Sequence, residues 1–203
     1  MTKRIRLPLA SVALLFVSCF CAGAAVTLDL NPAGGSIVGT PGSTVGWGFT
    51  LSNDANYLVV TEARFCLSPV TTPFCTLAST GTFSDIIGNA FVVVGPAGPP
   101  AFEQPVVTQS FNSNAPSGIG SFLINGNALP GSVDAGEIVV TYDLYTRSPN
   151  DPGFSPLTDL ISEQNYVTAP AQVSVTGVPE PAPLGLTGAA ILLLALRRRQ
   201  GGH

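Results

Sequence analysis

Alternation of apolar and polar residues runs through the middle of this chain and constrains its fold more than any other feature. In Val45–Leu51 four apolar side chains alternate with glycine and threonine, and Glu137–Tyr145 follows much the same pattern. Val26–Leu30 and Ala171–Val175 repeat it over shorter lengths. Because successive side chains of a strand point to opposite faces, this period of two predicts strands with one face in a core.

Further segments rich in strand-forming residues lie between these four. They are Tyr57–Leu67, Thr82–Ile87, Ala90–Val94, Val106–Phe111 and Ile119–Ile124. Stretches rich in Gly, Pro and Asn predict the turns Asn31–Pro41, Gly95–Pro105 and Asn125–Asp134. No amphipathic helix pattern occurs in this part of the sequence. Short strands at this spacing predict a single all-β domain, Ala25–Thr176, folded as a two-sheet, immunoglobulin-like sandwich.

The first 24 residues are typical of a secretory signal peptide. A basic start is followed by the apolar run Leu7–Cys21, and the small residues Ala22 and Ala24 then occupy the −3 and −1 positions of a cleavage site. A cut after Ala24 is preferred, and a cut after Ala25 also satisfies the rule. We therefore expect export through the Sec machinery, with an uncleaved N-terminal anchor as the alternative.

A proline-rich linker, residues 177–183, follows the expected β-domain and contains Pro179, Glu180 and Pro181. Together with Pro183, three prolines fall in five positions. Proline removes backbone donors and favours an extended backbone, so this linker is expected to be non-helical and accessible.

An apolar run of 15 residues, Ala182–Leu196, comes next. As a helix it would span about 22 Å against a bilayer core of roughly 30 Å, which predicts a short transmembrane segment over residues 182–196. Residues 197–203 begin with Arg197, Arg198 and Arg199. Arginines next to a span stay on the cytoplasmic side, so they predict that the β-domain lies outside the inner membrane.

In this order, the Pro179-Glu180-Pro181 motif, the apolar run and the arginines resemble the PEP-CTERM sorting signal of exosortase substrates. The resemblance covers about the last 25 residues. It implies that the tripeptide is recognised by an exosortase, an integral-membrane cysteine protease of Gram-negative bacteria that also make exopolysaccharide. It further implies that Arg197–Arg199 act as a retention signal until the tail is processed. The alternative is a plain C-terminal anchor behind a proline-rich linker.

Acidic residues dominate the expected β-domain. Residues 25–178 contain eleven Asp and Glu residues, no lysine, and only Arg64 and Arg147 as cations, a net charge of −9. A surface of this sign repels nucleic acid and anionic lipid surfaces, so neither is an expected partner.

Two cysteines, Cys66 and Cys75, remain once the expected signal peptide is removed. In an exported, oxidising setting this pair predicts a disulfide, which closes a small loop worth about 2–3 kcal/mol on the chain-entropy model. The alternative, a catalytic thiol, needs a nearby base, and the single histidine of the sequence is His203.

Few other residues are candidates for chemistry. Trp47 shares the apolar face of its predicted strand, which favours core packing over a sugar-stacking platform. Glu62 and Glu137 could form a glycosidase pair, but each falls on the polar face of a predicted strand, where a solvated acid is typical. We therefore expect no catalytic residues, no cofactor and no enzymatic activity.

The long segment Thr146–Tyr166 is predicted as a loop. It contains Asn150, Asp151 and Asp159, with Asp143 just upstream, and oxygen ligands of this kind suit Ca²⁺. Their spacing matches no EF-hand motif, so these four residues are calcium candidates without a predicted metal site.

These expectations combine into a leading function and an alternative. The leading one is a non-enzymatic cell-surface or extracellular-matrix protein, held transiently in the inner membrane, released through its tail and associated with exopolysaccharide. Segments such as Val45–Leu51 and Tyr57–Thr61 also resemble PEP-CTERM proteins whose bodies have no assigned activity. The alternative is a carbohydrate- or Ca²⁺-binding extracellular module permanently anchored in the membrane.

Overall fold

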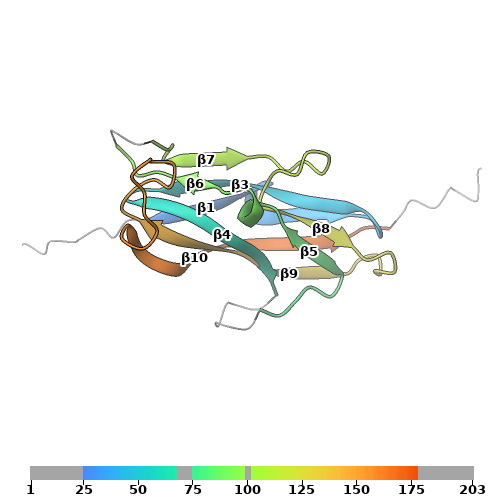
Figure 1. Ribbon diagram of the computed structural model, residues 1–203. Helices are drawn as coiled ribbons and strands as arrows, with labels where there is room; N and C mark the ends of the chain where they lie inside the picture. Colours follow the sequence, from blue (N-terminus) through green and yellow to red (C-terminus); the bar gives the residue numbers. More distant parts are fainter. Residues whose placement is uncertain (1–24, 68–74, 99–101, 178–203) are drawn as a thin grey trace, which may run out of the picture.

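The computed structural model describes residues 25–67, 75–98 and 102–177. Within these residues, ten strands form two stacked sheets, and two short 3-10 helices lie in the connections (Figure 1). The expected all-β, two-sheet sandwich is thereby confirmed. The predicted signal peptide, transmembrane segment and basic end lie outside the described residues, and no helix among those described is long and apolar enough to cross a membrane.

The first sheet has the strand order β1-β3-β8-β5. Its members are β1 (Val26–Asn31), β3 (Thr44–Asn53), β8 (Gly120–Ile124) and β5 (Gly81–Asp85), and β7 (Val106–Gln109) pairs with the second half of β3. All pairs are antiparallel. The central strand, β3, is the one with the strictest alternation in the sequence.

The second sheet has the order β2-β10-β9-β4-β6. It consists of β2 (Ser36–Gly39), β10 (Leu160–Val175), β9 (Val133–Tyr145), β4 (Tyr57–Cys66) and β6 (Val93–Val94). Only β2 and β10 run parallel, and the other pairs are antiparallel.

The two ends of the sandwich differ in what they carry. At the end that we call the exit end, β10 finishes at Val175 and the described chain leaves the domain. At the opposite end, the far end, β10 begins at Leu160 and the described chain enters β1. Figure 1 shows the first and last described residues at opposite ends of the sandwich.

The prediction that Asn31–Pro41 is only a turn was wrong. This segment holds a 3-10 helix, η1 (Ala33–Gly35), and then β2. Ile37 of β2 is buried, and β2 pairs with the end of β10, about 136 residues later in the chain. A four-residue strand between glycines shows no clear alternation, and its partner lies far away in sequence, so the local pattern could not reveal it.

The prediction that Thr146–Tyr166 is a loop was right only for its first part, because β10 already begins at Leu160. The register between β10 and β9 shifts between Leu160 and Ser162 and again between Ser162 and Asn165. Gln164, between these positions, has a positive φ of 55°. Bulges insert extra residues into a strand, so they remove the period of two by which a strand is recognised.

Trp47 lies at the centre of the core and is fully buried. Its indole Nε1–H donates to the Gly35 carbonyl oxygen at 2.6 Å, and its ring centroid lies 5.4 Å from that of Phe65 and 6.4 Å from that of Phe122. These rings come from both sheets. The core-packing interpretation of Trp47 is confirmed, and a buried indole offers no platform for a sugar.

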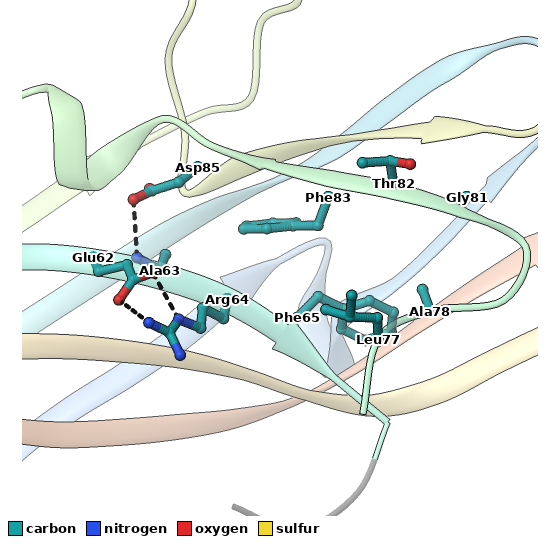
Figure 2. Close-up of a pocket in the computed structure, with 10 residues that line it drawn as sticks. All are labelled: Glu62, Ala63, Arg64, Phe65, Leu77, Ala78, Gly81, Thr82, Phe83 and Asp85. Carbon is teal, nitrogen blue, oxygen red and sulfur yellow. Dashed lines mark hydrogen bonds and ion pairs between the residues drawn. The ribbon is translucent and has the colours of Figure 1, made fainter. Parts of the chain in front are cut away.

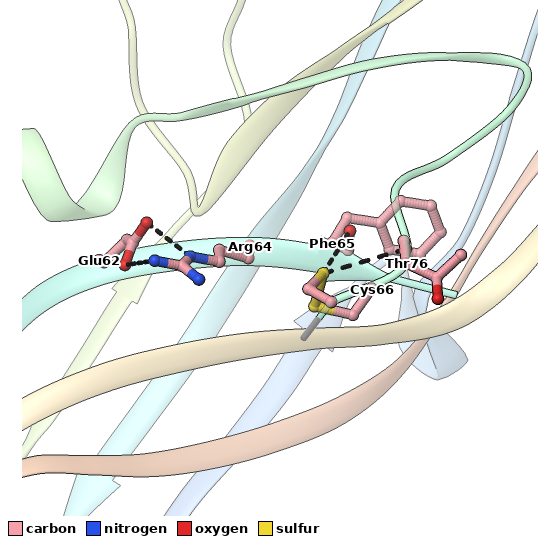
Figure 3. The surroundings of a disulfide bond; sticks show 6 residues. Glu62, Arg64, Phe65, Cys66 and Thr76 are labelled. Carbon is pink, nitrogen blue, oxygen red and sulfur yellow. Dashed lines mark hydrogen bonds and ion pairs between the residues drawn. A yellow bond between two sulfur atoms is a disulfide. The ribbon is translucent and has the colours of Figure 1, made fainter. Parts of the chain in front are cut away.

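The predicted disulfide between Cys66 and Cys75 is present, with Cα atoms 5.1 Å apart (Figure 3). It joins the end of β4 to the segment that leads into β5. Because β4 and β5 belong to different sheets, the disulfide restrains the connection between the two layers. On the chain-entropy model a loop of this size contributes about 2–3 kcal/mol by restricting the unfolded chain.

Candidate functional site

A groove lies between β4 of one sheet and β5 of the other, with a cavity volume of about 420 Å³ (Figure 2). We call it the seam groove. Its lining residues are Glu62, Ala63, Arg64 and Phe65 of β4, Leu77 and Ala78 of the connecting segment, and Gly81, Thr82, Phe83 and Asp85 of β5. The volume falls within the range of small-ligand clefts, roughly 300–1,000 Å³.

The seam groove exists because both strands are sheet edges at this point. Within the described residues, β6 pairs with β4 only at Leu58 and Val59, and β5 pairs only with β8. The register of β4 against β9 also shifts between Val60 and Glu62, and such a bulge bends a strand. The second half of β4 is therefore left uncovered beside β5.

One end of the seam groove is closed by Asp85. Its carboxylate accepts hydrogen bonds from the Ala63 amide at 3.1 Å and the Gly88 amide at 3.0 Å, so it links β5 to β4 directly. Burial raises the pKa of Asp85; the two amide hydrogen bonds lower it, and the nearby Glu62 charge adds to the increase. The net effect is a raised pKa, which marks this as a dehydrated position.

Asp134 of β9 does not line the groove, but it is buried and holds the segment between the lining residues Ala78 and Gly81. Its carboxylate accepts four hydrogen bonds, from the amide and hydroxyl of Ser79, both at 2.8 Å, and of Thr80, both at 2.7 Å. Burial raises the pKa of Asp134, but the four hydrogen bonds outweigh it, and the net pKa is lowered. Sequence reasoning missed this residue, because a single acid at the start of a strand is usually solvated.

Charged side chains of the seam groove are all partnered. Arg64 donates from Nε and Nη2 to the two carboxylate oxygens of Glu62 at 2.6 and 2.7 Å, and both side chains are about half exposed (Figure 3). Asp85 is held by the two amides. The described residues contain no histidine that could act as a base here.

Apolar side chains form the wall of the seam groove. Phe83 lies in its middle and packs on the core, with its ring centroid 6.2 Å from that of Trp47 (Figure 2). Leu77 lies at its rim and is 77% exposed. An uncharged ligand would find aromatic and aliphatic contacts here, beside carboxylate oxygens that can still accept hydrogen bonds from hydroxyl groups.

Glu62 and Glu137 are not brought together as a glycosidase pair. In the register of β4 and β9, Glu62 faces Thr141, whereas Glu137 faces Cys66. Four residues along a strand correspond to about 13 Å, and the paired carboxyl groups of glycosidases are about 5–9.5 Å apart. Only Glu62 lines the seam groove.

Three of the calcium candidates instead accept hydrogen bonds from backbone amides near the far end, Asp143 between two strands and Asp151 and Asp159 within the loop before β10. Asp143 accepts from the Gln164 amide at 2.9 Å, Asp151 from the Gly153 amide at 2.7 Å, and Asp159 from the Ser155 amide at 2.8 Å.

The remaining calcium candidate, Asn150, bridges two loops. Its amide Nδ2 donates to Glu103 Oε1 at 2.7 Å, and the buried Ser148 hydroxyl donates to the same oxygen. No group of three or more His, Cys, Asp or Glu residues is placed to hold a metal ion in the described part of the chain. All four candidates hydrogen-bond to other groups of the protein.

The sequence-predicted processing residues cannot be placed in the fold. The cleavage-site residues Ala22 and Ala24, the motif Pro179-Glu180-Pro181 and the arginines 197–199 all lie outside the described residues. No protein-family model matches the chain, and no curated protein matches it.

Proposed function

We propose that this chain is an exported, non-enzymatic protein of the cell surface or extracellular matrix, sorted and processed through its C-terminal tail. The observation that carries the proposal is the order of Pro179-Glu180-Pro181, the apolar run 182–196 and the arginines 197–199. The disulfide supports it, because such bonds persist mainly in oxidising compartments outside the cytoplasm. Its partners on this route are the Sec machinery and an exosortase-type protease.

The β-domain, which we call the body, is proposed to be an immunoglobulin-like sandwich. In that fold one sheet has the order A-B-E-D and the other the order G-F-C. The orders β1-β3-β8-β5 and β10-β9-β4 support this correspondence. One difference is the extra edge strand β6, which lies beside β4 in the second sheet. In the chain it follows β5, the strand that takes the place of strand D.

The seam groove is proposed as the contact site for exopolysaccharide. Its apolar wall suits the flat faces of sugar rings, and its carboxylates suit their hydroxyl groups. The net charge of −9 on the body repels polymers rich in acidic sugars. The expected ligand is therefore a neutral or amino-sugar polymer.

The processing part of the proposal is tested by the intact mass of the protein recovered from the envelope and medium of its native host. We expect a species that starts near Ala25 and ends between Val178 and Pro183. A species that keeps Arg197–Arg199 and stays in the inner membrane would contradict processing and favour a permanent anchor.

Polysaccharide binding is tested by affinity electrophoresis of the Leu77→Asp variant in gels that contain dextran, chitosan or alginate. Leu77 is mostly exposed, so the fold should be unaffected, whereas loss of an apolar contact at the rim should weaken binding to neutral dextran about tenfold. Chitosan is cationic, so the added carboxylate should not weaken binding to it. The matched control is Leu157→Asp at the far end, where Leu157 is 93% exposed. Equal retardation of the two variants in dextran, or binding of the native chain to alginate alone, would exclude the seam groove as this site.

A further inference from the structure

Exposed apolar side chains gather where the described chain leaves the domain. We define the exit patch as Val38, Leu129 and Val133. We propose that, while the tail is in the inner membrane, the exit patch lies in the lipid interface of that membrane's outer leaflet. The inference depends on the proposed function, because it requires residues 182–196 to insert into the bilayer.

The sheet register places two members of the exit patch side by side. Ser174 of β10 faces Val38 of β2 on one side and Val133 of β9 on the other. Residues directly opposite one another in a sheet project from the same face. Val38 and Val133 are 57% and 50% exposed, so they form a row with Ser174 on the outer face of the second sheet.

The turn that carries Leu129 is tied to the end of β10. The Gly131 amide donates to the Val175 carbonyl at 2.7 Å, and the Val175 amide donates to the Ser132 carbonyl at 2.9 Å. Leu129 itself is 75% exposed. The patch is therefore fixed to the last residues before the tail and presents apolar surface without a covering partner in the described part of the chain.

The length of the linker decides what the exit patch meets. Residues 177–181 separate β10 and Thr176 from the apolar run and reach at most about 18 Å when fully extended. Tethering over so short a distance keeps the patch at a high effective concentration beside the bilayer. Leu157 lies three residues before the start of β10 at the far end, which the length of the sandwich holds away from the surface (Figure 1).

The lack of charge on the exit patch indicates which kind of lipid surface it contacts. The exit patch has no charged side chain, whereas the rest of the body is strongly acidic. An acidic body does not bind anionic lipid by itself, so the contact must come from burial of apolar side chains next to an inserted tail. The occupant is the zwitterionic or weakly charged interface of a bilayer.

The test uses the exported full chain in vesicles of brominated phosphatidylcholine, with Leu129→Trp and, separately, Leu157→Trp as matched control. The native Trp47 is fully buried and gives a constant background. A tryptophan that enters the interface is quenched by bromine, so we expect about twofold lower fluorescence for Leu129→Trp and little change for Leu157→Trp. Val38→Trp provides a second position with the same expected result.

Flotation of the same vesicles separates the two hypotheses. If the chain does not float with lipid, the tail does not insert, and both the proposed function and this inference fail. If the chain floats but the Leu129 and Leu157 variants are quenched equally, the tail inserts and only the exit-patch contact is overturned.

Discussion

Replacement of Trp47 by alanine is expected to lower the free energy of unfolding by about 3–5 kcal/mol. The indole is fully buried and its ring contacts Phe65, Phe83 and Phe122, so its removal leaves a large cavity between the two sheets. The substitution also leaves the Gly35 carbonyl without its Nε1–H donor. Denaturant unfolding followed by circular dichroism measures the loss.

Two control variants separate packing from hydrogen bonding at Trp47. Trp47→Phe keeps a ring but removes the donor to Gly35, so it should cost less, about 1–3 kcal/mol. Leu157→Ala changes a side chain at the far end that is almost fully exposed and should shift stability by no more than about 0.5 kcal/mol. If Trp47→Ala were as mild as Leu157→Ala, Trp47 would not be the centre of the core.

The second large effect is expected at Asp134. Asp134→Ala leaves the amides and hydroxyls of Ser79 and Thr80 without their acceptor, and Thr80 is buried. An unsatisfied buried donor costs about 1–3 kcal/mol, so we expect a loss of about 3–4 kcal/mol in urea unfolding, since hydroxyls can turn to other partners. The segment between the disulfide and β5 should loosen as well, and amide hydrogen exchange at Thr80 would report it.

Asp134 should also make the protein sensitive to acid. Its pKa in the folded state is lower than in the unfolded chain, where an aspartate titrates near 3.9, so its stabilisation is complete above about pH 4. That stabilisation is lost as the pH falls through the folded-state pKa. Asp134→Asn should therefore lower stability at neutral pH and flatten its decline in acid.

Asp85 provides the opposite control, because its pKa is raised in the folded state. Protonation of Asp85 is easier in the folded than in the unfolded chain, so acid relieves its unfavourable burial. Asp85→Asn should therefore leave the decline below pH 4 in place. An Asp134→Asn variant whose stability falls in acid as steeply as that of the native chain would refute the role of Asp134.

Much of the fold could be predicted from local patterns. The strictest alternation, at Val45–Leu51, falls inside β3, and Val26–Leu30 lies within β1. Alternation did not reveal strands where pairing was short or irregular: β2 has four residues, and the first part of β10 contains two register shifts. Such strands are defined by their partners rather than by their own period.

The seam groove could not be predicted from the sequence. It depends on the uncovered edges of β4 and β5 and on two carboxylates. Asp85 accepts a hydrogen bond from the Ala63 amide, 22 positions away, and Asp134 accepts one from the Ser79 amide, 55 positions away. A lone acid in a sequence gives no sign of whether it will be solvated or will bind buried amides. Its partners become known only when the chain is folded.

The sequence by itself determined that the chain is all-β and that its two body cysteines pair. It also determined that the tail contains a Pro-Glu-Pro motif, an apolar run and arginines in the order of a sorting signal. These properties depend on short-range periodicity, composition and spacing. Only the tertiary structure decided that Asp134 accepts hydrogen bonds from Ser79 and Thr80, that Glu62 and Glu137 lie apart, and that Val38, Leu129 and Val133 surround the exit of the chain. These depend on which strands pair and in what register, and a shift of one residue would reverse every face.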